Sequence, residues 1–202
     1  MTIAPRGLWA RIPHEVDGAR FLVRNLRFAR GIPSVPTIRF HEFTLAGARR
    51  ADVDGVRRLH KALRDGIDLN VWRRELYALR GRSLLVVTKD SMDRIVGFEM
   101  FYARSGEHEA RTVHEAFIGV AEEFRGRGLA QQMRSLAITH FANGGLSGIS
   151  SSIMAENAAS VGSALRCGFK IVSESVGLDG QVSLSLFRPL HSASEFAEQG
   201  DA

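Results

Sequence analysis

The sequence predicts one α+β domain, a mixed α/β arrangement in which helices cover a mixed sheet. Two observations carry this prediction. Segments with strand-like and helix-like periodicity alternate along most of the chain, and short turns rich in Gly, Pro, Asn or Asp separate them. The chain has 202 residues, of which 45% are hydrophobic, so it can bury a core without disulfides or metals.

Apolar residues at helical or strand spacing define each element in turn. The expected helices cover residues 14–31, 52–63, 68–79, 128–141 and 158–166, and the expected strands cover residues 37–45, 84–87, 95–102, 112–120, 147–154, 169–175 and 181–187. Polar turns at residues 90–93 and at Leu178-Asp179-Gly180 join successive strands, which predicts two hairpins.

Charge divides the chain into three parts. Residues 1–36 hold six arginines and two acidic residues, a net charge of +4, whereas the whole chain carries +5. We therefore expect a basic, helical N-terminal extension at 1–36, a domain at 37–190 and a polar tail at 191–202. The amphipathic extension can pack on the domain or on a second copy in a homodimer. The alternatives are contact with a membrane or with nucleic acid through its arginines.

Cysteine usage and hydropathy indicate a cytoplasmic protein. Cys167 is the single cysteine, so no intramolecular disulfide can form. The first residues lack the apolar run of a signal peptide, and no stretch reaches the length of a membrane span. Without a CxxC pair or a Cys/His cluster, we expect no metal site.

The segment most informative about function follows the strand expected at 112–120. It runs Arg125-Gly126-Arg127-Gly128-Leu129-Ala130 and leads into an amphipathic helix. Glycines let the backbone approach a ligand closely, and the first N–H groups of a helix lack intrahelical partners, so this turn is suited to bind phosphate. Neither GxxxxGK[ST] nor GxGxxG is present, which argues against a nucleotide-triphosphate loop and a dinucleotide fingerprint.

Two motifs in order make the sequence resemble a known family. Arg125-x-x-Gly128-x-Ala130 resembles the R/Q-x-x-G-x-G/A signature of the GNAT acyltransferases. About 30 residues later, Asn157 opens a short helix that ends in Gly168-Phe169, which resembles a second motif of that family. The resemblance covers residues 37–190.

The resemblance implies a mixed, mostly antiparallel, twisted sheet flanked by helices. It implies that acetyl-CoA, or another acyl-CoA, is the co-substrate and that a small-molecule or peptide amine accepts the acyl group directly. The turn from Arg125 to Ala130, including Gly126, Arg127, Gly128 and Leu129, would hold the pyrophosphate. Ile118, Gly119 and Val120 would contact the thioester, and Asn157 and Ser160 would contact the cofactor further along. The alternatives are transfer of a longer acyl chain and a non-catalytic CoA-binding module.

The resemblance also directs attention to the general base that must deprotonate the amine. Several members carry Glu or His at the position of His114, and Glu115 is a second candidate, with Glu99 further removed. Strict alternation would place His114 on one face with Ile118, and Glu115 on the other. The tyrosine that many members use as general acid is replaced by Ala164, so water or Ser163 would substitute.

Overall fold

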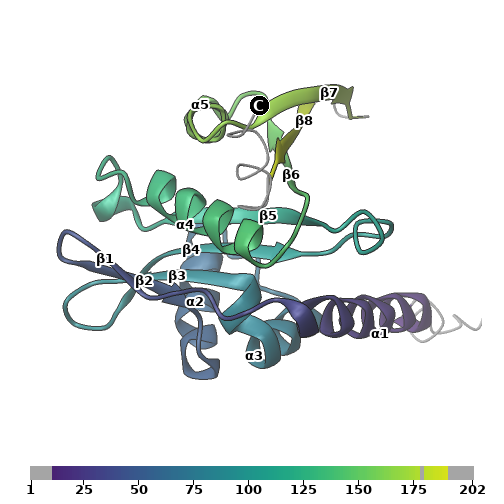
Figure 1. Ribbon diagram of the computed structural model, residues 1–202, viewed down its shortest axis with the longest axis horizontal. Helices are drawn as coiled ribbons and strands as arrows, with labels where there is room; N and C mark the ends of the chain where they lie inside the picture. Colours follow the sequence, from purple (N-terminus) through teal and green to yellow (C-terminus); the bar gives the residue numbers. More distant parts are fainter. Residues whose placement is uncertain (1–10, 178–179, 191–202) are drawn as a thin grey trace, which may run out of the picture.

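A single sheet of eight strands runs through the part of the chain that the computed structural model describes, residues 11–177 and 180–190 (Figure 1). The strands are β1 (Ile38–Phe40), β2 (Phe43–Gly47), β3 (Leu85–Lys89), β4 (Ile95–Tyr102), β5 (Thr112–Val120), β6 (Gly148–Met154), β7 (Lys170–Val176) and β8 (Val182–Pro189). Their order is β1-β2-β3-β4-β5-β6-β8-β7, and every neighbouring pair is antiparallel except β5 with β6. The predicted mixed, mostly antiparallel sheet is confirmed.

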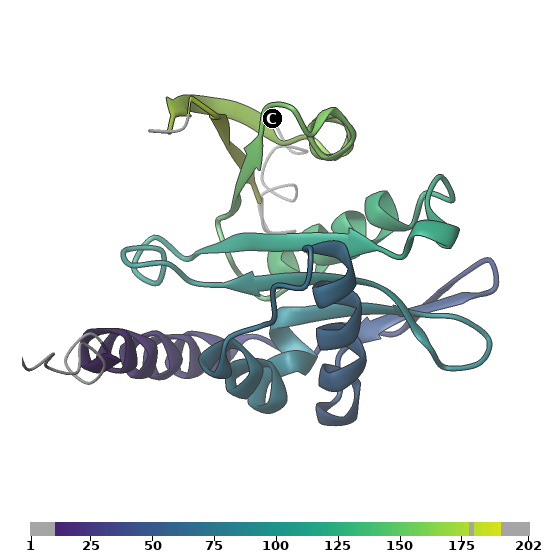
Figure 2. The same cartoon turned by 180° about the vertical axis from the view of Figure 1, so that it is seen from behind.

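Helices cover both faces of this sheet. They are α1 (Arg11–Phe28), α2 (Val53–Leu63), α3 (Val71–Leu84), α4 (Leu129–Asn143) and α5 (Ala158–Arg166), with short 3-10 turns at Ala29–Gly31, Arg50–Asp52 and Glu122–Phe124. Helices α2 and α3 lie on one face, and Figure 2 shows them in front of the sheet. Helix α4 packs on the opposite face, with α5 beside it.

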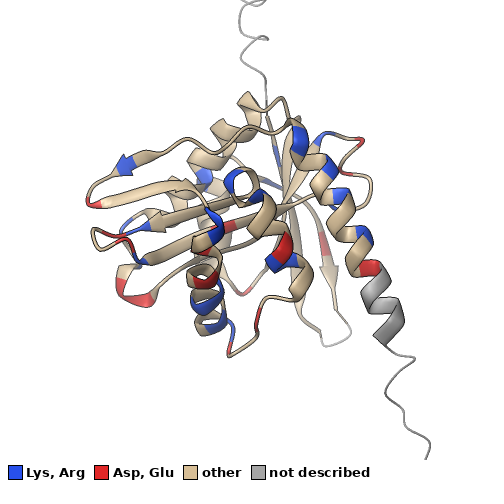
Figure 3. Cartoon of the chain, turned by 90° about the horizontal axis from the view of Figure 1, so that it is seen from below, with Lys and Arg blue, Asp and Glu red and all other residues tan. Residues whose placement is uncertain are grey.

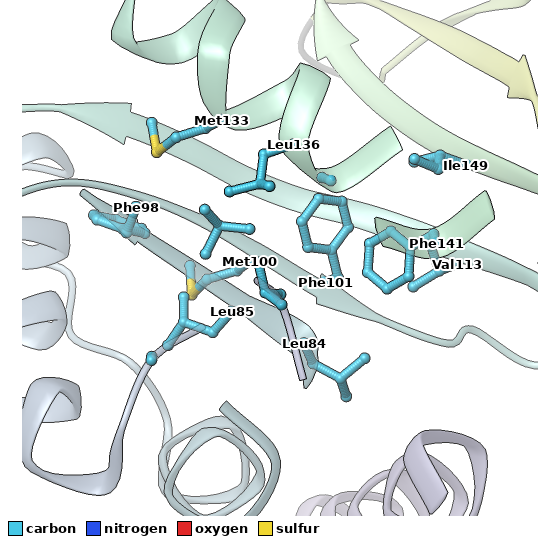
Figure 4. Packing of buried hydrophobic residues seen from close by; sticks show 14 of the residues in the cluster. Leu84, Leu85, Phe98, Met100, Phe101, Val113, Met133, Leu136, Phe141 and Ile149 are labelled. Carbon is cyan, nitrogen blue, oxygen red and sulfur yellow. The ribbon is translucent and has the colours of Figure 1, made fainter. Parts of the chain in front are cut away.

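The core between α4 and the sheet is built from the apolar stripe that the sequence predicts for this helix (Figure 4). Met133 and Phe141 are fully buried, and the Phe141 ring meets Phe101 of β4 edge to face with centroids 4.7 Å apart. Each large apolar side chain buried in this way contributes about 1.5–3 kcal/mol to stability. The packing fixes α4, and with it the turn that precedes the helix, against β4 and β5.

Two predicted elements differ from the structure. The single strand expected at 37–45 is a hairpin of β1 and β2, because His41 adopts a φ of 52° and reverses the chain. Histidine is one of the few residues other than glycine that is enriched in this left-handed region. The helix expected to end at Leu79 continues to Leu84, with non-helical backbone angles at Arg80. The turn residues 178–179 and the tail 191–202 lie outside the described residues.

Helix α1 packs on the domain through α3, so this part of the basic extension has a partner within the chain. Gly18 lies so close to Trp72 that an added Cβ would stand 1.9 Å from the indole nitrogen. Further along, the buried side chain of Asn25 accepts a hydrogen bond from the N–H of Ala103 and donates one to its carbonyl. Basic residues recur along the helix (Figure 3). Residues 1–10 of the extension lie outside the described part.

Candidate functional site

Strands β5 and β6 pair over only four residues each. Thr112–Glu115 pair in parallel with Gly148–Ser151, and the pairing ends there. Residues 116–120 of β5 are half-buried, whereas the four paired residues are buried. Figure 1 shows β6, β8 and β7 turned away from β5 beyond this point. The second half of β5 therefore has an edge without a β6 partner, and such an edge offers backbone N–H and C=O groups to an extended ligand.

A β-bulge in β5 changes which side chains share a face. Met100 pairs with Phe117 but Phe101 pairs with Glu115, so Ala116 has no residue opposite it. The expectation that His114 and Ile118 share a face is therefore wrong, because the extra residue reverses the alternation. His114 and Phe117 lie toward α2 and α3, whereas Glu115 and Ile118 lie toward α4.

The predicted anion turn follows β5 at once. Gly126 and Gly128 have φ angles of 76° and 78°, in the left-handed region that favours glycine. A Cβ added to Gly126 would meet nothing within 4 Å, so the turn is open on that side. Gly128 is the N-cap of α4 and has no side chain that could cap the helix. The first intrahelical bond is donated by the N–H of Gln132 to the carbonyl of Gly128. The N–H groups before Gln132 are free of intrahelical acceptors, which fits a phosphate group.

The two arginines of this turn have different surroundings. A nitrogen of Arg127 lies 3.0 Å from Oε1 of Glu42, and the guanidinium stacks over Phe124 at 5.3 Å. Arg127 thus ties the turn to the β1–β2 hairpin. Arg125 donates only a long bond, 3.4 Å, to the carbonyl of Val120, and no described carboxylate pairs with it. Arg125 is the turn's arginine whose charge remains available to an anion.

The two predicted contacts on α5 are both engaged with the protein. The Oδ1 atom of Asn157 accepts a hydrogen bond from the N–H of Ser160 at 3.1 Å and so caps the helix. The Ser160 hydroxyl and carbonyl in turn accept from the guanidinium of Arg134 at 3.3 and 3.4 Å. Ala164, at the position of the family's tyrosine, is fully buried, and the buried hydroxyl of Ser163 has no partner among the described residues.

His114 is buried within a chain of hydrogen bonds. Its Nε2 atom lies 2.5 Å from a guanidinium nitrogen of Arg104, which can only donate, so the Nε2 lone pair accepts. Its Nδ1 atom lies 2.9 Å from the Ser150 hydroxyl, which donates to Glu107 at 2.6 Å. These partners fix a neutral imidazole protonated on Nδ1. Burial, followed by the charges of Arg104 and Arg73, lowers the pKa of His114 to about 3.

Glu115 forms a buried ion pair on the other face. Its two oxygens accept from Arg134 of α4 at 2.7 and 3.3 Å, and only 3% and 1% of the two side chains are exposed. Arg134 was not among the predicted site residues, although an arginine beside the apolar stripe of α4 was the available signal. Because Arg134 also bonds Ser160, it connects β5 with α5, the helix that follows β6.

Glu99 of β4 lies beside this pair and pairs across the sheet with Ile118. Both carboxyl oxygens are buried without a partner among the described residues. Burial, and then the negative charge of Glu115, raises the pKa of Glu99 well above 4.5. Burial therefore favours the neutral, protonated form of Glu99.

Metal binding and membrane insertion find no support in the described residues. The described residues hold no group of three or more His, Cys, Asp and Glu side chains arranged to bind a metal ion. Within the same part of the chain, every helix is too short or too polar to cross a membrane.

The fold is similar to solved acetyltransferase structures. One is the NatC complex bound to Gag peptide and CoA, with a TM-score of 0.64 and 15% identity over 74% of this chain and 99% of that chain. Another is yncA from Salmonella typhimurium with its cofactor acetyl-CoA, with a TM-score of 0.61 and 19% identity over 73% and 94%. A third is a spermidine N-acetyltransferase SpeG variant from Vibrio cholerae, with a TM-score of 0.60 and 18% identity over 74% and 95%.

Identities this low show the fold alone, and no curated protein matches the sequence. The family model described as Acetyltransferase (GNAT) family matches residues 54–169, more than half of the chain. The match runs from α2 to the end of α5 and includes strands β5 and β6, the turn and Asn157. The chain belongs to the GNAT family of N-acetyltransferases, whose co-substrate is acetyl-CoA.

Proposed function

We propose that this protein transfers the acetyl group of acetyl-CoA directly to a primary amine of a small molecule or a peptide. The observation that carries the proposal is the continuity between the unpaired part of β5 and the turn at Arg125–Gly128. One extended ligand can bind its phosphates at the turn and its acyl end along the strand. The similar structures named for spermidine and for a bound peptide support an amine acceptor.

The residues present fit this co-substrate, which supplies the activated thioester. The free N–H groups at the start of α4, at Leu129, Ala130 and Gln131, would hold the pyrophosphate, and Arg125 would add a charge-assisted contact. Backbone N–H groups of Ile118, Gly119 or Val120 would donate to the thioester carbonyl and stabilise the oxyanion that develops on it.

We assign proton removal from the amine to His114, on one condition. An imidazole with a pKa of about 3 and a guanidinium on its lone pair is a weak base, so Arg104 must leave Nε2 before His114 can act. Glu115 is held by Arg134 and serves as a positioning residue for β5. With Ala164 in place of the tyrosine, water would protonate the departing thiolate.

Calorimetric titration of acetyl-CoA, CoA and a long-chain acyl-CoA tests the donor site. Arg125→Glu and Gly128→Asp place negative charge at the turn, and we expect both to weaken acetyl-CoA binding at least tenfold. Gly106→Asp is the matched control, because Gly106 has a φ of 83° and nothing within 4 Å of an added Cβ, so it carries the same backbone strain away from the turn.

Each result has a defined meaning. Preference for the long chain would replace acetyl by a longer acyl group. Tight binding without transfer to any amine would favour a non-catalytic CoA-binding module. A folded protein that binds none of the three ligands would refute the proposal.

A further inference from the structure

Three guanidinium groups contact aromatic side chains on the face of the sheet toward α2 and α3. Arg64 lies 5.4 Å from the ring centroid of Phe117, Arg73 lies 5.3 Å from that of Tyr102, and Arg104 contacts His114. Among the residues that the structure describes, none of the three has an ion-pair partner. On the same face, by contrast, Arg57 and Asp68 form a close pair at 2.6 Å. The three arginines therefore place positive charge on this surface without an ion pair to a described carboxylate.

Arg104 lies at the point where β5 and β6 separate. His114 pairs with Ser150, and the last paired position is Glu115 with Ser151. The same nitrogen of Arg104 that contacts His114 also donates to the hydroxyl of Ser152 at 3.2 Å, one residue beyond the last pair. Arg104 therefore bridges the two strands beside the unpaired edge. An acceptor that reaches the edge from the α2 and α3 face passes this exposed side chain.

The nearby carboxylates Glu107 and Asp68 are held by other partners. Glu107 uses one oxygen for the Ser150 hydroxyl and the other for the backbone N–H of Arg104, both at 2.6 Å. Asp68 is held by Arg57. Both Arg104 and Arg73 lower the pKa of His114, and no carboxylate is among the causes of its shift. An arginine has five N–H donors in a planar fork that matches a carboxylate or phosphate, and a neutral imidazole uses only one of them.

We propose that the acceptor is a primary amine that also carries a carboxylate or phosphate group, and that Arg104 and Arg73 bind this anion. This inference rests on the proposed function. Binding moves the guanidinium of Arg104 from Nε2 of His114 to the anion and frees the lone pair. Nε2 then takes a proton from the amine. The amine nitrogen bonds to the acetyl carbon, and the carbon–sulfur bond breaks with its electron pair on sulfur. Water then carries the proton from Nε2 to the thiolate, which restores the neutral imidazole.

Matched acceptors test the preference. β-Alanine, 2-aminoethylphosphonate and 3-aminopropionamide present the same primary amine with a carboxylate, a phosphonate or a neutral amide. We expect kcat/KM for at least one anionic acceptor to exceed that for the amide by about ten- to a hundredfold, the range of one or two charge-assisted hydrogen bonds. Which anion is preferred identifies the group that the arginines bind. Equal rates for all three would overturn the inference.

Variants assign the preference to residues. Arg104→Gln and Arg73→Gln should each reduce it at least fivefold. Arg111→Gln should leave the preference unchanged. Arg111 is exposed at the end of the β4–β5 loop that also holds Arg104, and it donates a hydrogen bond to the carbonyl of Gly145. A preference that survives both Arg104→Gln and Arg73→Gln would also contradict the inference.

A binding experiment avoids dependence on turnover. Propionate and methylphosphonate, added without amine, should shift the imidazole ¹⁵N resonances of His114 in the wild type but not in Arg104→Gln. No shift with either anion would contradict the proposed displacement. Titration of acetyl-CoA into the same samples separates the two proposals: donor binding without anion preference leaves the acetyltransferase function standing, whereas loss of donor binding removes both.

Discussion

Glu115 of β5 and Arg134 of α4 form an almost fully buried ion pair, although 19 positions separate them in the chain. Removing one member of such a pair leaves an uncompensated buried charge. We expect Arg134→Met to lower the free energy of unfolding by about 3–5 kcal/mol, measured by urea denaturation.

The double variant Glu115→Leu/Arg134→Met tests the origin of that loss. With both charges removed, much of the stability should return, because no ion remains buried alone. Arg58→Met is the control for loss of an exposed arginine and should stay within about 0.5 kcal/mol of the wild type. A double variant less stable than Arg134→Met would show that burial of a lone charge is not the cause.

Glu99 should make the protein less stable as pH rises. Its folded-state pKa is raised above 4.5, so above that pH the unfolded chain releases a proton that the native protein retains, and unfolding becomes easier with increasing pH. Glu99→Gln replaces the titrating carboxyl group by a neutral amide, so the decline in stability above pH 5 should become less steep. Parallel curves for wild type and variant, from denaturation at several pH values, would contradict a raised pKa of Glu99.

His114 should act in the opposite direction at lower pH. Its folded-state pKa of about 3 lies below the ordinary value of 6.5, so between these values the unfolded chain binds a proton that the native protein does not. Its contribution to stability is therefore complete above pH 6.5 and is lost as pH falls toward 3. His114→Gln should make the acid-side slope shallower by at most about 1.4 kcal/mol per pH unit.

The same titration gives a test of the Arg104 contact. Arg104→Gln removes the second cause of the low pKa while burial and Arg73 remain, so the pKa of His114 should rise part of the way toward 6.5. NMR titration of the imidazole resonances measures it directly. An unchanged pKa would mean that Arg104 does not contact Nε2 in solution.

Gly18 should be required for the docking of α1. Alanine favours helix by about 1 kcal/mol over glycine, yet here its Cβ would collide with Trp72, so we expect Gly18→Ala to be destabilising by about 1–3 kcal/mol. Gly31→Ala, where an added Cβ meets nothing within 4 Å, should be neutral. Thermal unfolding compares the two, and equal effects would show that α1 is not held against α3.

The parts of the fold that the sequence predicted are those with strong local signals. The limits of β5 and α5 agree with the prediction to the residue, because the apolar pattern of each ends at a clear polar or glycine boundary. The turn at Gly126 and Gly128 was likewise predictable from residues that tolerate positive φ.

The rest depends on contacts between distant segments. The bulge at Ala116 carries no local signal, since period-two alternation assumes that no residue is added. Arg104 meets His114 only because the loop between β4 and β5 folds back on the sheet, and the turn at His41 and Glu42 contains neither glycine nor proline. A nearest-neighbour pattern contains none of these relationships.

The short parallel pairing between β5 and β6 has a thermodynamic consequence. Four residue pairs join the two parts of the sheet. Beyond them, the backbone groups of β5 that face away from β4 can form hydrogen bonds with a bound ligand. Acetyl-CoA bound there would hold the two parts of the sheet together as well as supply the acetyl group. A ligand that binds only the native state raises the stability of the protein as its concentration increases. The melting temperature of the protein should therefore rise with the concentration of acetyl-CoA.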